Sequence, residues 1–182
     1  MITRNFYKEI QDINELPEKG KVLDLGCGNG RFSLPFSEAG FTCVLIDNRE
    51  DMLNRARFDV QKNAEYHLQD LNTFLQASTE QYEIIIANNV LPFLSKKDSD
   101  DALKYIYDHL KPNGIFIGVL FGDRDPWNRD GRNTEVFHSR AEALDVLSKY
   151  KILDFREIDA LLGLLVGGVK QWHRFEFIAK KL

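Results

Sequence analysis

Short runs of apolar and β-branched residues alternate along this chain with segments of helical periodicity. The clearest run is Tyr82–Ala87, where three isoleucines follow one another, as expected for a strand covered on both faces of a sheet. Apolar residues spaced three or four positions apart predict helices between such runs. In total the pattern predicts seven strands, at residues 21–25, 42–46, 65–69, 82–87, 115–121, 152–159 and 171–179.

The predicted helices begin and end at recognisable signals. A helix over 31–39 is closed by Gly40, and the apolar stripe from Met52 to Val60 predicts a second helix. A third helix, over 102–110, stops at the turn 111–114, which we expect to lie outside both neighbouring elements. Ser139 with Glu142 fits a capping box that opens a helix ending near Tyr150.

Strands that alternate with helices imply crossover connections and a mainly parallel sheet. The predicted fold is a doubly wound α/β domain, with seven strands, helices on both faces and an antiparallel last strand. At 182 residues the chain suits a single domain. Within it we expect residues 1–20 to form a helical cap and residues 122–138 to form a loop on the substrate side.

Composition and charge limit the classes of partner that we expect, and they do not change the predicted fold. The formal charge of −4 and the pI near 5.6 disfavour nucleic acid as a partner, because phosphate backbones are bound by clustered basic residues. The longest apolar run, 160–169, is about half the length of a membrane span, and residues 1–6 show no secretory signal. We therefore expect a soluble cytoplasmic protein. Cys27 and Cys43 have no metal-ligand spacing, and no metal site is predicted.

The most informative segment is the loop that follows the first strand. It carries glycines at positions 26, 28 and 30, and glycine is needed where a backbone turns tightly or approaches a ligand. Ligands of open α/β sheets bind at the carboxyl ends of the strands. Asp24 stands where its carboxylate could bond loop amides or face a cationic group. A tight turn without a ligand is the alternative interpretation.

A second acid, Asp47, closes the second strand. A carboxylate there can accept hydrogen bonds from both hydroxyls of a ribose. The alternative is that Asp47 only starts a solvated helix with Asn48 and Glu50. A nicotinamide loop would need a third glycine at position 31, where this chain has Arg31, so an oxidoreductase is disfavoured.

The pattern Asp-x-Gly-x-Gly-x-Gly, together with the acid after strand two, resembles the class I S-adenosylmethionine-dependent methyltransferase family. The resemblance spans about residues 20–121 and implies S-adenosylmethionine as the cofactor. It implies that Gly26, Gly28 and Gly30, in the loop that also holds Cys27, line the methionine part. Asp24 would orient the loop and the methionine ammonium, and Asp47 would hold the ribose. The resemblance further places Asn48 and Met52 along the adenosine, Asp70 and the Leu71 backbone at the adenine, and Asn88 near the sulfonium. The alternatives are a surface helix cap for Asp70 and a turn for Asn88.

The acceptor side carries weaker signals. Residues 88–93 lack the Asn/Asp-Pro-Pro-aromatic motif of amino-methylating nucleic-acid enzymes, and the segment 125–127 follows the wrong strand to supply it. Methyl transfer from a sulfonium is a direct displacement that needs alignment more than a covalent nucleophile. The candidates for a base are His138, with local capping or packing as the alternative, and His173 in the final strand. Substrate-side candidates are Tyr7, Asn89, Arg124 and Trp127.

The sequence thus predicts a methyltransferase acting on a small molecule or a metalloid oxyanion. Segments 121–127 and 169–175 resemble the tellurite-resistance subgroup of the family. The alternative function is a non-catalytic module that binds S-adenosylmethionine for regulation. The acceptor atom and the oligomeric state are not indicated by any pattern.

Overall fold

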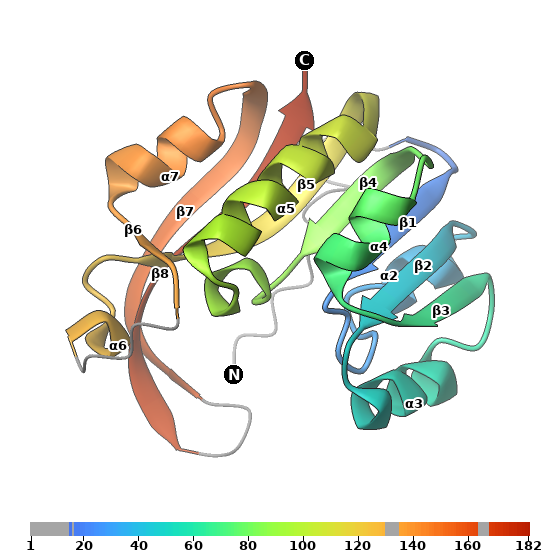
Figure 1. Cartoon of the computed structure of the whole chain (residues 1–182), viewed down its shortest axis with the longest axis horizontal. Coiled ribbons are helices and arrows are strands. Elements are labelled where there is room, and N and C mark those ends of the chain that lie inside the picture. Colours follow the sequence, from blue (N-terminus) through green and yellow to red (C-terminus); the bar gives the residue numbers. More distant parts are fainter. Residues whose placement is uncertain (1–14, 16, 130–134, 164–167) are drawn as a thin grey trace.

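The computed structural model describes residues 15, 17–129, 135–163 and 168–182. Its centre is a mixed sheet in which the strand order is β3-β2-β1-β4-β5-β8-β7. The first five strands run parallel, and β8 lies antiparallel between β5 and β7 (Figure 1). The bounds are β1 Lys21–Leu25, β2 Thr42–Asp47, β3 Ala64–Leu68, β4 Tyr82–Ala87, β5 Leu110–Gly122, β7 Tyr150–Gly163 and β8 Val169–Lys181.

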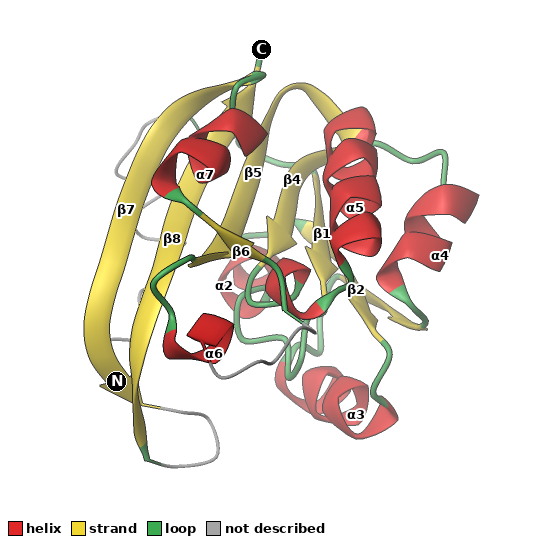
Figure 2. Ribbon diagram, turned by 60° about the vertical axis from the view of Figure 1, so that its left-hand side comes forward, coloured by secondary structure: helices red, strands yellow, loops and turns green. Residues whose placement is uncertain are grey.

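Helices cover both faces of this sheet (Figure 2). Each face has its own core: α4, α5 and α7 pack on one side and α2 and α3 on the other. Neighbouring strand residues alternate between the two cores, as Val22 and Leu23 do, because successive side chains of a strand point to opposite faces. The helices are α2 Leu34–Glu38, α3 Glu50–Asp59, α4 Leu71–Ala77, α5 Lys96–His109, α6 Pro126–Arg129 and α7 Arg140–Val146, with a 3-10 turn, η1, at Leu91–Phe93.

The predicted doubly wound fold is confirmed, with one strand more than expected. The short strand β6, Phe137–His138, pairs in parallel with the end of β5 and brings the sheet to eight strands among the described residues. Two residues are too few to produce a periodic signal. The last strand is antiparallel, as predicted. It also forms a long hairpin with β7, in which Tyr150 pairs with Lys181 and Gly163 with Val169.

Several predicted boundaries were wrong. The helix expected at 31–39 begins at Leu34, because the backbone turns over 30–33 first. Helix α4 was not predicted. The helix that opens at Ser139 has the predicted capping box but ends at Val146.

The turn expected at 111–114 falls within the bounds of β5. Pairing with β4 jumps from Tyr82↔Leu110 to Ile84↔Ile115, so these residues form an irregularity in the ladder. Asn113, at φ 64°, turns the chain there. The prediction that residues 111–114 lie outside both neighbouring elements was therefore wrong, because Leu110 already pairs with Tyr82 before the irregularity.

The expected N-terminal helical cap lies mostly outside the described residues, and so do Tyr7 and positions 130–134 of the expected substrate-side loop. Residues 17–20 contain no helix. Among the described residues, no helix combines the length and the apolar character that crossing a membrane requires.

Candidate cofactor and acceptor site

The glycine loop and Asp47 meet at one edge of the sheet. Strands β1 and β2 are parallel neighbours, so their carboxyl ends emerge side by side. The Gly28 amide donates a hydrogen bond to Asp47 Oδ2 at 2.8 Å, and the Arg49 amide donates to Asp47 Oδ1 at 2.9 Å. The two features that the sequence predicted to share one ligand therefore touch each other.

The backbone of the glycine loop adopts a conformation that other residues rarely reach. Gly26 and Gly28 have φ values of 62° and 56°, in the left-handed region that favours glycine. A Cβ on Gly26 would lie 2.6 Å from a methyl of Val90, whereas one on Gly28 would meet only the tip of Met52, at 3.4 Å. Val90 therefore packs against the loop at Gly26, and the Met52 side chain reaches it at Gly28.

Asp24 is a buried carboxyl beneath this loop. Its relative exposure is 1%, and the Ser33 hydroxyl donates a hydrogen bond to Oδ2 at 2.6 Å. Burial raises the pKa of Asp24 to about 7, the nearby Asp47 charge adds to this rise, and the Ser33 hydrogen bond opposes it. A ligand ammonium beside Asp24 would offset the cost of its buried charge, so this carboxyl fits the methionine end of S-adenosylmethionine.

The residues expected along the adenosine are only partly brought together. Met52 reaches Gly28, while Asn48 is exposed at the start of α3. Asp70 caps α4: its Oδ1 accepts hydrogen bonds from the Thr73 amide at 3.0 Å and the Thr73 hydroxyl at 3.3 Å. The neighbouring Leu71 is buried in the core of that face.

The segment after β4 lies against the glycine loop. Asn88 is half-buried, and Asn89 turns the chain at φ 55°. The Oδ1 of Asn89 is buried and has no hydrogen-bond partner in the described part of the chain. A buried acceptor without a donor is costly, so this amide is suited to bind a donor group of a ligand.

The substrate-side candidates Arg124 and Trp127 point to different surroundings. The Arg124 guanidinium turns toward β7, 2.7 Å from Glu157 and 3.3 Å from Asp159. Trp127 instead joins a cluster of rings with Phe93, Phe121 and Trp172, at centroid distances of 5.4 to 6.3 Å from it.

The two candidate bases are both buried. His173 Nδ1 accepts a hydrogen bond from the Arg124 amide at 2.9 Å, so its Nε2 carries the proton and donates to Glu157 at 3.0 Å. His138 lies in β6, where burial lowers its pKa. These contacts occupy both ring nitrogens of His173, and a catalytic role for either histidine stays a prediction.

Sequence reasoning missed a buried ion pair between Asp125 and Lys170. Asp125 is fully buried, and Lys170 Nζ lies 2.5 Å from both of its oxygens. The ammonium also lies 4.1 Å and 3.9 Å from the ring centroids of Trp127 and Trp172. No signal in the sequence singles Lys170 out, because its strand also carries the polar residues Gln171, His173, Arg174 and Glu176.

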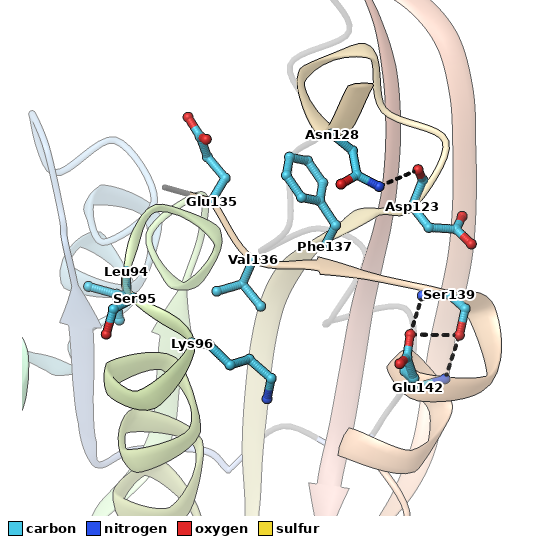
Figure 3. Close-up of a pocket in the computed structure, with 10 residues that line it drawn as sticks. All are labelled: Leu94, Ser95, Lys96, Asp123, Asn128, Glu135, Val136, Phe137, Ser139 and Glu142. Atoms are coloured by element: carbon cyan, nitrogen blue, oxygen red, sulfur yellow. Dashed lines mark hydrogen bonds between the residues drawn. The ribbon is translucent and has the colours of Figure 1, made fainter. Parts of the chain in front are cut away.

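A separate cavity of about 640 Å³ lies between the first turns of α5 and α7, with β6 crossing it (Figure 3). Lys96, Asp123 and Glu142 line it, and Glu142 is held by the capping box of α7. None of the residues expected to bind the cofactor belongs to its lining. The cavity is distinct from the edge where the glycine loop meets Asp47.

Comparison with known proteins agrees with this geometry. A model of the family described as "methyltransferase domain" matches residues 22–114, which includes the glycine loop, Asp47 and the loop after β4. The chain belongs to this methyltransferase family. The predictions of the class I family and of S-adenosylmethionine as its cofactor are confirmed.

Among its relatives, the chain is 34% identical over 119 residues to the ubiquinone biosynthesis O-methyltransferase of Hydrogenovibrio crunogenus. The alignment covers 63% of this chain and 47% of that relative. The chain is 29% identical to the carboxy-S-adenosyl-L-methionine synthase of Campylobacter concisus, over 96% of this chain and 77% of that one. Several of the curated relatives it matches are about twice as long as the part this chain covers.

Among solved structures, TehB from Haemophilus influenzae superposes with a TM-score of 0.78 at 23% identity, covering 96% of this chain and 62% of that chain. The magnesium protoporphyrin IX methyltransferase of Synechocystis, solved with bound cofactor, superposes with a TM-score of 0.68 at 17% identity, over 97% of this chain and 76% of that one. These likenesses establish the shared fold.

Proposed function

We propose that this methyltransferase moves the methyl group of S-adenosylmethionine to a small molecule by direct displacement. The observation that carries the proposal is the contact between the Gly28 amide and Asp47 at the edge where Asp24 is buried. When bound, the cofactor supplies an activated methyl group on a sulfonium. The chain has to hold the donor, align the acceptor and exclude water.

On the donor side, each acid has a separate task. Asp47 accepts hydrogen bonds from the ribose hydroxyls, and its own position is fixed by the two backbone amides that it binds. Asp24 pairs with the methionine ammonium. Gly26, Gly28 and Gly30 let the backbone pass close to the methionine part, and Met52 packs along the adenosine.

A covalent nucleophile on the protein is not part of the proposal. Cys27 and Cys43 are both buried, and burial raises the pKa of the Cys43 thiol to about 12 and that of Cys27 further still. Both thiols therefore stay protonated and unreactive near neutral pH. The formal charge of −4 supports a small acceptor over a polyanion.

Calorimetry with S-adenosylhomocysteine tests the donor site. Asp47→Ala removes hydrogen bonds to a charged group, each worth about 1.5–3 kcal/mol, so we expect affinity to fall at least about tenfold. Asp51→Ala, an exposed acid of α3 paired with Arg49, is the matched control and should bind as the native chain does. If Asp47→Ala binds S-adenosylhomocysteine as tightly as the native chain does, Asp47 does not hold the ribose.

Turnover is tested by incubating the chain with labelled cofactor and a panel of thiols, phenols, amines and tellurite. Methylation of any member with saturation kinetics supports the enzyme. Cofactor binding without methylation of any member would favour the regulatory module.

A further inference from the structure

The segment that follows β5, residues 122–127, lies next to the turn that follows β4. The Val136 amide donates a hydrogen bond to the Pro92 carbonyl at 2.8 Å, and the rings of Phe93 and Trp127 are in contact, with centroids 6.3 Å apart. Both connections leave the carboxyl ends of parallel strands, and ligands of open α/β sheets bind at that edge. Residues 122–127 therefore stand on the side where we expect the acceptor.

His173 of β8 reaches this segment with its ring. The side chain is fully buried, and its Nδ1 accepts a hydrogen bond from the Arg124 amide at 2.9 Å. A Cβ on Gly122 would collide with the same ring, so the glycine leaves room for it. The His173 amide also donates to Asp125 Oδ2 at 3.2 Å, and Asp125 Oδ1 accepts from the Trp127 amide at 3.0 Å. One residue of β8 thus binds two consecutive residues of the segment.

An acid of β7 determines which nitrogen of His173 carries the proton. Glu157 Oε1 lies 3.0 Å from Nε2 of His173 and 2.7 Å from the Arg124 guanidinium. Hydrogen bonds from His173 and Arg124 lower the pKa of Glu157, so it is ionised near neutral pH and accepts the Nε2 proton. In a neutral imidazole the other nitrogen is then an acceptor, which is the state that the Arg124 amide requires.

We propose that His173 is a positioning residue of the acceptor site, which holds residues 122–127 in place through its Nδ1. This inference rests on the proposed function. The imidazole transfers no proton in this role and acts through the Arg124 amide. That bond sets the backbone leading to Asp125, and Asp125 fixes the start of the turn that carries Trp127. Loss of the bond displaces Trp127 and weakens binding of an acceptor beside it.

Two variants that each keep one half of the imidazole test this role. In His173→Asn the side-chain oxygen takes the place of Nδ1 and accepts from the Arg124 amide. In His173→Gln the longer side chain reaches Glu157 and leaves that amide without an acceptor. Asn removes more volume than Gln, so a packing role alone predicts the larger defect in His173→Asn. The proposal predicts it in His173→Gln.

Tryptophan fluorescence reports on this segment directly, because the two tryptophans of the chain are Trp127 and Trp172. We expect acrylamide to quench His173→Gln at least about twofold more strongly than the native chain, since an amide that loses its acceptor favours an open segment by about tenfold. His173→Asn should be quenched as the native chain is. His67→Gln, in β3 at the other end of the sheet, is the matched control and should also match the native chain.

Turnover is the second measurement, with the best acceptor from the panel of thiols, phenols, amines and tellurite. In His173→Gln the KM for this acceptor should rise about tenfold while the affinity for S-adenosylhomocysteine stays the same. His173→Asn should keep most of the native KM. A defect in His173→Asn that equals or exceeds the defect in His173→Gln overturns the proposal, as does native quenching in His173→Gln.

If neither variant folds, the tautomer of His173 in the native chain decides. Proton–nitrogen correlation spectra of the histidine-labelled chain, assigned by replacing the other three histidines in turn, should show the proton on Nε2. A proton on Nδ1 overturns the proposal. If the native chain does not bind S-adenosylhomocysteine, the proposed function itself is wrong, and the quenching and the tautomer still decide whether His173 holds the segment.

Discussion

Two buried aspartates, Asp24 on the donor side and Asp125 on the acceptor side, have opposite surroundings. Asp24 accepts a hydrogen bond from the neutral Ser33 hydroxyl, and its pKa is raised to about 7. Asp125 is paired with the Lys170 ammonium and also accepts hydrogen bonds from the Trp127 amide at 3.0 Å and the His173 amide at 3.2 Å. On the proposed donor side, the Asp24 carboxyl is left for a cationic ligand. On the proposed acceptor side, Lys170 neutralises Asp125, and the neighbouring side chains are the aromatic rings of Trp127 and Trp172.

The largest expected effect comes from breaking the acceptor-side pair. Asp125→Ala leaves the Lys170 ammonium buried without its partner, which typically costs about 3–5 kcal/mol of unfolding free energy. Urea unfolding followed by circular dichroism measures this loss. The double variant with Asp125→Ala and Lys170→Met should recover a large part of it, since no buried charge remains.

Asp159→Ala is the control for this prediction. It removes an exposed acid that pairs with Arg124, so the unfolding free energy should change little. If Asp125→Ala and Asp159→Ala lose the same unfolding free energy, the burial of the Asp125–Lys170 pair does not raise the cost of breaking it.

A smaller effect is expected from the pH on the donor side. An ammonium binds the ionised form of Asp24, so the affinity for S-adenosylhomocysteine should rise about tenfold between about pH 6 and about pH 8. The pKa of Asp24 lies above its ordinary value of 3.8, so its ionisation lowers the stability of the unliganded fold as the pH rises toward 7. In Asp24→Asn the affinity should be lower and nearly independent of pH.

Calorimetry across this pH range checks the dependence, with Asp51→Asn as a control that keeps the native profile. A native profile that stays flat across the range would contradict the pairing of Asp24 with the ammonium.

The smallest effect concerns Asp70, which has a structural task and an expected binding task. Asp70→Ala removes the cap of α4 and should cost about 1 kcal/mol of unfolding free energy. Asp70→Ser keeps a capping oxygen, so stability should be retained while any contact of the carboxylate with adenine is lost. Weaker S-adenosylhomocysteine binding in Asp70→Ser, measured by calorimetry, would assign the carboxylate to the adenine, and unchanged binding would leave it as a cap alone.

The sequence predicted that the glycine loop and Asp47 meet, because its signals there are local. The glycines at 26, 28 and 30 lie within one loop, and Asp47 follows directly after a strand whose apolar pattern is plain. The parallel pairing of β1 with β2 then brings the two together, as a doubly wound fold requires. The roles of these residues toward the cofactor remain predictions, as do those of Asp24, Met52, Asn48, Asp70 and Asn88.

The acceptor side could not be predicted in the same way. Asp125 and Lys170 are 45 positions apart, and no periodicity relates a loop acid to a lysine in a distant strand. Residues 122–138 were expected to form a loop, whereas Asp125 is buried and the described part of this segment contains α6 and β6. Arg124 was expected on the substrate side, and in the structure its guanidinium pairs with the β7 acids Glu157 and Asp159. Its role toward a substrate stays a prediction.

The placement of β8 between β5 and β7 affects how the chain can fold during synthesis. Strand β7 leaves the ribosome before β8, yet among the described residues its ladder with β8 is the one that joins it to the sheet. Phe177 of β8 also fills the space above Gly118 of β5, so that part of the interior stays open until β8 arrives. Until β8 is synthesised, β7 is an exposed strand without a partner. We expect the nascent protein to need a chaperone most during the interval between the synthesis of β7 and that of β8.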